Sequence, residues 1–119
     1  MSIDKATEFG NIKISAEAIA TLAGGVVTEC YGVVGMASQK LLKDGLAELL
    51  GKENYSKGIV VRETNKQLEI DLYIIIGFGI KISEVVLEVQ KKVKYVLEKT
   101  LDTKFKSINI YVQGVRVIS

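Results

Sequence analysis

Two carboxylate residues, Glu69 and Asp71, have a spacing that could do chemistry. They lie two residues apart in a segment that alternates apolar and polar positions, as strands do. Side chains two apart on a strand share one face, about 7 Å from each other. Such a pair could hold a metal ion or act as general acid and base. No third ligand lies nearby in the sequence, so the pattern favours a solvated strand face.

The missing residue types narrow the chemistry further. The chain has 119 residues, no histidine and one cysteine. It therefore cannot assemble a Ser-His-Asp triad, a Cys-His pair or the usual zinc ligand sets. Cys30 falls on the apolar stripe of an expected helix, which predicts an inert buried thiol, and a lone cysteine fits a reducing compartment. We predict no catalytic residue, no metal, no cofactor and no enzymatic activity.

A GxxG segment, Gly32-Val33-Val34-Gly35, lies between two expected helices. This order is similar to that of KH domains, whose GxxG loop clamps a nucleic-acid backbone. A phosphate clamp favours Lys or Arg at the middle positions, whereas Val33 and Val34 are apolar. The segment therefore predicts a tight turn. A KH-like single-stranded RNA-binding module, using this loop and the basic long helix, is the alternative function.

Basic residues gather toward the end of the chain. Residues 81–119 hold eight basic and four acidic side chains, which gives this part a net charge of +4. The rest of the chain holds eight basic and ten acidic side chains, which gives a net charge of −2. Lys91, Lys92 and Lys94 lie close together on the expected long helix. Such a patch could meet anionic lipid headgroups or an acidic partner, although it is more typical of a solvated helix face.

The chain is expected to form one domain, residues 1–119 with a core from about 8 to 118. The fold class is α+β, with a small mixed sheet of about four strands and two longer helices packed on one face, in the order β-α-α-β-β-α-β. The turn Asn65-Lys66 predicts a hairpin, Ser15 and Ser83 are expected helix N-caps, and Gly114 predicts a bulge. The expected strands are 8–14, 58–64, 67–77 and 107–119, and the expected helices are 16–30, 38–50 and 84–101.

The second face of this sheet is too apolar in places to be plain solvent surface. It would carry Glu69, Asp71, Tyr73, Ile75, Tyr111 and Gln113. A partner or a second copy could cover it. The predicted interaction residues are Tyr73, Ile75, Tyr111, Gln113, Lys91, Lys92 and Lys94.

The N-terminal residues lack the basic and apolar run of a signal peptide. The longest apolar segment, 72–80, is too short to cross a bilayer as a helix. We expect a cytoplasmic protein, peripheral at the membrane at most.

Several stretches together resemble one family: 10–15, 31–36, 57–61, 68–74, 78–82 and 108–115. The chain is similar to the alkaline shock proteins, a family of envelope stress response proteins found mainly in Gram-positive bacteria, and looks like a short, housekeeping-type member. One departure is 101–103, where family members often have a glycine after the long helix.

The resemblance implies a cytoplasmic, non-enzymatic protein of cell-envelope stress or homeostasis that self-associates. It also implies a membrane-anchored protein partner and no catalytic residues. An accessory role beside a lipid- or metabolite-handling enzyme is a further expectation, and nucleic acid is the less favoured partner.

Overall fold

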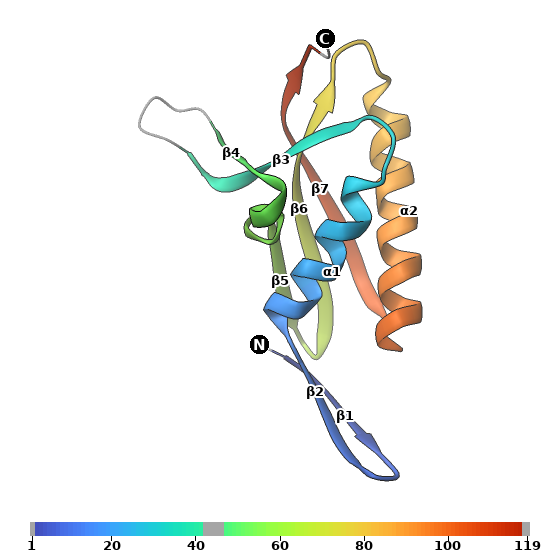
Figure 1. Cartoon of the computed structure of the whole chain (residues 1–119). Helices are drawn as coiled ribbons and strands as arrows, with labels where there is room; N and C mark the ends of the chain where they lie inside the picture. Colours follow the sequence, from blue (N-terminus) through green and yellow to red (C-terminus); the bar gives the residue numbers. More distant parts are fainter. Residues whose placement is uncertain (1, 42–46, 118–119) are drawn as a thin grey trace.

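The computed structural model describes residues 2–41 and 47–117. It is an α+β structure with two helices, a five-stranded mixed sheet and a separate N-terminal hairpin (Figure 1), which confirms the predicted fold class. The elements are β1 (Ser2–Thr7), β2 (Gly10–Ser15), α1 (Ala16–Thr28), β3 (Val33–Leu41), β4 (Ala47–Leu50), the 3-10 helix η1 (Lys52–Gly58), β5 (Ile59–Thr64), β6 (Gln67–Gly77), α2 (Ile82–Leu101) and β7 (Phe105–Arg116).

Strand β6 organises the sheet. Strand β7 runs parallel to it along one edge, from Leu68 opposite Phe105 to Gly77 opposite Arg116. The other edge of β6 is shared by two antiparallel strands, β5 over its first half and β3 over its second. The β5-β6 turn is the predicted one, because Asn65 and Lys66 both have positive φ (52° and 64°), as a type I′ hairpin requires.

The core lies between one face of the sheet and the two helices. The alternation predicted for β6 is confirmed, since its inward side chains all belong to the core cluster with residues of α1 and α2. These inward residues are Leu68, Ile70, Leu72, Ile74 and Ile76. The bulge predicted near Gly114 is also present, as a register shift between the pairs Ile74–Val112 and Ile75–Gly114.

The predicted second helix at 38–50 is wrong. Residues up to Leu41 belong to β3, and Ala47–Leu50 forms β4, while 42–46 lie outside the described residues. The reason is tertiary: β5 begins opposite Leu72, so the edge of β6 around Ile74 would lack a hydrogen-bonding neighbour without β3. The local leucine pattern could not reveal that requirement.

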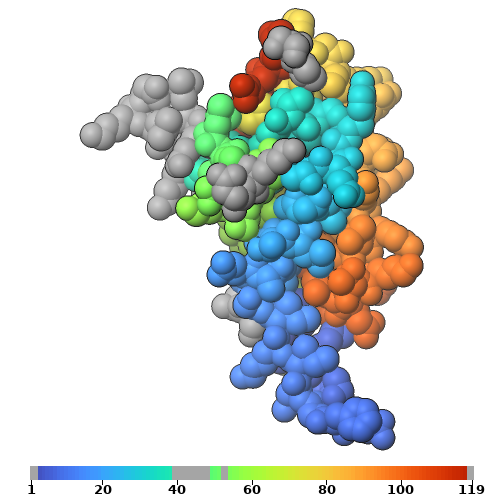
Figure 2. All heavy atoms as spheres, in the orientation of Figure 1, coloured from blue at the N-terminus to red at the C-terminus, as the bar shows by residue number. Residues whose placement is uncertain are grey.

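The N-terminal segment also differs from the prediction. A single strand was expected over 8–14, whereas β1 and β2 form a hairpin in which Thr7 pairs with Gly10. Figure 2 shows this hairpin extending beyond the helices at one end of the molecule. Ile3 is nevertheless buried in the core cluster, so the base of the hairpin is packed against the body.

Element boundaries account for the remaining corrections. Helix α1 ends at Thr28 rather than Cys30, and α2 begins at Ile82 with Lys81 as N-cap, so Ser83 lies inside the helix. Residues 52–57, which lie between the expected helix and the expected strand, belong to η1, and Tyr55 within it is buried. The Ser15 cap is confirmed, because the Ala18 N–H donates to the Ser15 hydroxyl at 3.1 Å.

Candidate functional site

The candidate site is the outer face of the sheet, defined as the outward side chains of β5, β6 and β7. Because side chains alternate along strands, these residues lie opposite the helices. The members are Arg62, Glu69, Asp71, Tyr73, Ile75, Ser107, Asn109, Tyr111 and Gln113.

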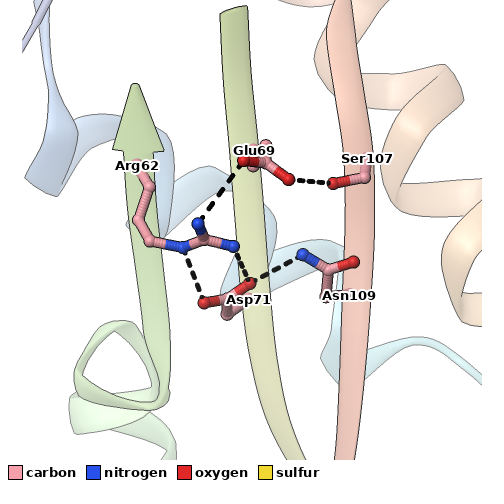
Figure 3. A network of polar contacts seen from close by, with 5 residues as sticks. All are labelled: Arg62, Glu69, Asp71, Ser107 and Asn109. Atoms are coloured by element: carbon pink, nitrogen blue, oxygen red, sulfur yellow. Dashed lines mark hydrogen bonds and ion pairs between the residues drawn. The ribbon is translucent and has the colours of Figure 1, made fainter. Parts of the chain in front are cut away.

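An ion-pair network crosses three strands on this face (Figure 3). The Arg62 guanidinium donates from Nε and Nη2 to the two Asp71 carboxylate oxygens, both at 2.9 Å. It also reaches Glu69 at 3.4 Å. From β7, Asn109 donates to Asp71 at 2.9 Å and Ser107 donates to Glu69 at 2.8 Å. The bidentate geometry adds strength and directionality to the Arg62–Asp71 pair and orients the Asp71 carboxylate.

The charges in this network stabilise one another. Burial opposes ionisation of Asp71, which is only 6 % exposed, but hydrogen bonds from Arg62 and Asn109 and the positive charge of Arg62 outweigh it. The pKa of Asp71 is therefore lowered. The hydrogen bond to Asp71 and its charge raise the pKa of Arg62. At neutral pH both groups are ionised, so Asp71 has no proton to donate as a general acid.

Both carboxylates, whose spacing allowed a metal or acid–base pair, accept hydrogen bonds from neighbouring strands. Among the described residues, no group of three or more acidic, cysteine or histidine side chains could hold a metal ion. Glu69 and Asp71 also differ from the solvated pair that the sequence favoured, because hydrogen bonds from β5 and β7 engage both of them.

Next to the network lies an aromatic pair. The rings of Tyr73 and Tyr111 stack with centroids 4.8 Å apart and planes 14° from parallel. Tyr111 is 45 % exposed and Tyr73 is half-buried. Desolvation, followed by the negative charge of Asp71, raises the pKa of Tyr73, so its hydroxyl stays protonated at neutral pH. The pair presents a rigid aromatic surface with polar ends.

Ile75 was predicted to take part in interactions, but it is only 2 % exposed. Gly114 and Gly35 flank its side chain: a Cβ on Gly114 would lie 3.4 Å from the Ile75 side chain and one on Gly35 would lie 3.7 Å away, both ordinary contact distances. Ile75 therefore supports the face from within. Gln113 is half-buried and lies beside the bulge.

The three lysines also predicted as interaction residues lie on a different surface. Lys91, Lys92 and Lys94 are exposed on α2, away from the outer face. Lys92 approaches Glu29 at 3.9 Å beside a pocket of about 220 Å³ between α2 and the segment that follows α1. Cys30 lines this pocket and is buried as predicted, and desolvation raises the pKa of its thiol. A raised pKa leaves the thiol protonated and weakly nucleophilic.

The GxxG segment does not form a loop between two helices. Gly32 lies in a turn with φ of +90°, and Val33 to Gly35 belong to β3, where Gly35 pairs with Ile75. The backbone of this segment bonds to the sheet, and a Cβ on Gly32 would lie 2.5 Å from the Val85 side chain. The structural basis of the similarity to KH domains is therefore absent.

The sequence reasoning missed Arg62, Ser107 and Asn109. A signal for Arg62 did exist, because the Asn65-Lys66 turn sets a register in which Arg62 faces Glu69. The β7 residues had no such signal. Strand β7 reaches β6 through a helical crossover, so its register depends on how α2 packs.

The fold and the outer face define a small α+β protein whose most organised surface is polar and aromatic. A family model for the alkaline shock protein 23 family, described as having a cell envelope-related function, matches residues 4–117. The chain belongs to this family.

Curated relatives agree with this assignment. The chain is 55 % identical over 117 residues to the uncharacterized protein YloU of Bacillus subtilis, covering 98 % of each chain. It is 43 % identical over 118 residues to the uncharacterized protein Spy1614 of Streptococcus pyogenes, covering 99 % of this chain and 98 % of that protein. A second Bacillus subtilis relative, the uncharacterized protein YqhY, is 30 % identical over 110 residues, covering 92 % of this chain and 80 % of that protein. No solved structure matches the chain.

Proposed function

We propose that this protein is a non-enzymatic interaction module of bacterial cell-envelope stress or homeostasis, which acts by self-association and partner binding through its outer face. The family gives the envelope-related function. The observation that supports a binding role is the Tyr73–Tyr111 stack beside a fully paired ion network.

Two physical properties make this face suited to association. Stacked tyrosines offer large contact area at low conformational-entropy cost, because their side chains are already ordered. The neighbouring charges already satisfy one another, so covering them leaves no unpaired ion. Asp71, the buried carboxylate of this face, is held ionised by its partners, which suits a structural role.

The proposed location is the cytoplasm, with a membrane-anchored protein or a metabolic enzyme as the partner class. Neither helix of the described residues combines the length and apolar character needed to cross a bilayer.

The test is the variant Tyr111→Asp, which places a charge in the centre of the proposed contact. Size-exclusion chromatography with light scattering measures the mass, and affinity purification from the native bacterium measures partners. We expect a lower mass and loss of partners, with circular dichroism unchanged. The matched control is Tyr95→Asp on α2, where the tyrosine is 63 % exposed and distant from the face.

An unchanged mass and an unchanged set of partners in Tyr111→Asp would refute the proposal. Salt-sensitive binding of single-stranded RNA by the unmodified protein would favour the RNA-binding alternative instead.

A further inference from the structure

The geometry points to a defined mode of self-association: we infer that the free edge of β7 pairs antiparallel with β7 of a second copy, centred on Tyr111. This inference rests on the self-association in the proposed function and places it at the edge of the outer face, where Tyr111 lies. In the described part of the chain, β7 pairs with β6 alone, although it is 12 residues long. A long unpaired edge presents backbone donors and acceptors to any compatible strand.

Two side chains of α2 bond to the first part of this edge. The Phe105 N–H donates to the Glu98 carboxylate at 2.8 Å, and the Gln90 amide donates to the Ile108 carbonyl at 3.0 Å. These side chains replace the hydrogen bonds of a missing neighbour strand. Beyond Ile108, no side-chain hydrogen bond of this kind is found among the described residues, so the open edge begins there.

Backbone groups alternate in direction along β7, and this alternation identifies which of them are available for pairing at the free edge. The Ile108 carbonyl points to the free edge, so the N–H and C=O groups of Ile110 and Val112 point there too. Antiparallel pairing about Tyr111 places Ile110 opposite Val112 of the second copy, and these residues exchange both backbone bonds. Tyr111 then faces Tyr111 of the second copy in a non-hydrogen-bonded pair, with Cα atoms about 4.5 Å apart.

The side chains of the same segment are complementary under this register. The two central tyrosines would extend each Tyr73–Tyr111 stack into a row of four rings across the dimer. Asn109 would face Gln113 of the second copy, so that each amide offers the other a donor and an acceptor. Leu87, which lies on the same side of α2 as Gln90 and is half exposed, is placed to contact the added strand.

The ends of the segment limit the pairing to a short ladder. The bulge at Gly114 interrupts the regular edge, and the same register would bring Lys106 near Arg116 of the second copy, where like charges repel. A ladder of about 109–113 remains. Under this register Tyr111 faces Tyr111 and the Asn109 and Gln113 amides face each other twice across a twofold axis, and this side-chain match is why we commit to a second copy as the occupant.

Disulfide trapping tests this register in a Cys30→Ala background. Tyr111→Cys is expected to form a covalent dimer on mild oxidation, because a Cα separation of about 4.5 Å lies within disulfide range. Asn109→Cys and Gln113→Cys are each expected to stay monomeric under denaturing electrophoresis, yet to cross-link when the two proteins are mixed. Tyr95→Cys on α2 is the surface control, and circular dichroism verifies folding of every variant.

The outcomes separate this inference from the proposed function. A native dimer by light scattering without the Tyr111→Cys cross-link overturns edge pairing and leaves self-association standing. A monomeric chain that still captures a partner in a Tyr111-dependent way overturns the second copy as occupant. A monomer with neither cross-link nor partner overturns both proposals.

Discussion

At the residue scale, opposing effects meet on the carboxyl group of Asp71. Burial raises its pKa, while Arg62 and Asn109 together lower it by more. The bonds to Asp71 therefore stabilise the fold more when Asp71 is ionised than when it is protonated. Removing one member leaves a polar or charged neighbour without its partner, which costs more than the intact contact contributes.

The variant Asp71→Asn is expected to lower the free energy of unfolding by about 1.5–3 kcal/mol at neutral pH. The pKa of Asp71 in the folded protein lies below its unfolded value of about 3.9. Between these two pKa values the unfolded chain binds more protons than the folded chain does. The unmodified protein therefore loses stability as the pH falls through that window. The difference in the free energy of unfolding between Asp71→Asn and the unmodified protein should shrink on acidification. Urea unfolding from about pH 7 to about pH 3 measures it. Exposed Glu63→Gln is the control, and a constant difference would contradict the assignment.

A second residue-scale prediction concerns Asp102, which ends α2 in the left-handed region with φ of +51°. It lies within 101–103, the segment where family members were expected to carry a glycine. Asp102→Gly should raise the free energy of unfolding by about 0.5–1 kcal/mol, because glycine adopts the left-handed conformation without strain. The loss of the contact between Lys5 and the Asp102 carboxylate reduces this gain. Lys5 keeps its bond to the backbone carbonyl. Asp102→Val should lower stability, and thermal unfolding that ranks the two variants in the reverse order would refute this account.

At the element scale, strand β3 depends on the turn that enters it. Gly32 reaches a φ of +90° and packs tightly against Val85 of α2, so the turn and the helix determine each other's position. This contact directs the chain away from α1 and toward the open part of the β6 edge. The same residues, read locally, had predicted only a turn between helices.

Gly32→Ala is therefore expected to lower the free energy of unfolding by about 1–3 kcal/mol, through backbone strain and the displaced Val85 side chain. Gly25→Ala is the matched substitution: it lies in α1, is exposed and has open space for a Cβ, so it should gain up to about 1 kcal/mol. Chemical denaturation of both variants tests the contrast. Equal effects would mean that the turn imposes no special constraint.

At the scale of the whole molecule, the outer face and the lysines of α2 are separate surfaces. The first is a polar and aromatic sheet face, and the second is the exposed side of a helix. Association through the outer face should therefore be insensitive to the lysines. Binding to an anionic surface, by contrast, would depend on them and would weaken as salt screens the charges.

The mass of the native protein should accordingly be the same at about 50 mM and about 500 mM salt, because strand pairing and aromatic contact involve little net charge. The double variant Lys91→Glu/Lys94→Glu should keep that mass. Light scattering checks both expectations. Dissociation at high salt, or in the lysine variant alone, would place the contact on α2 instead.

The sequence by itself determined the fold class, the β5-β6 hairpin, the cap at Ser15 and the bulge near Gly114, because each depends on local patterning or on one residue's backbone preference. It also identified Tyr73 and Tyr111 as members of one sheet face. It could not determine the partners of Glu69 and Asp71 on β7, or the conversion of the expected second helix into β3 and β4. Those outcomes depend on which backbone edge of β6 needs a neighbour and on where α2 places β7. Both are decided by contacts between segments distant in the sequence, which only the packed structure brings together.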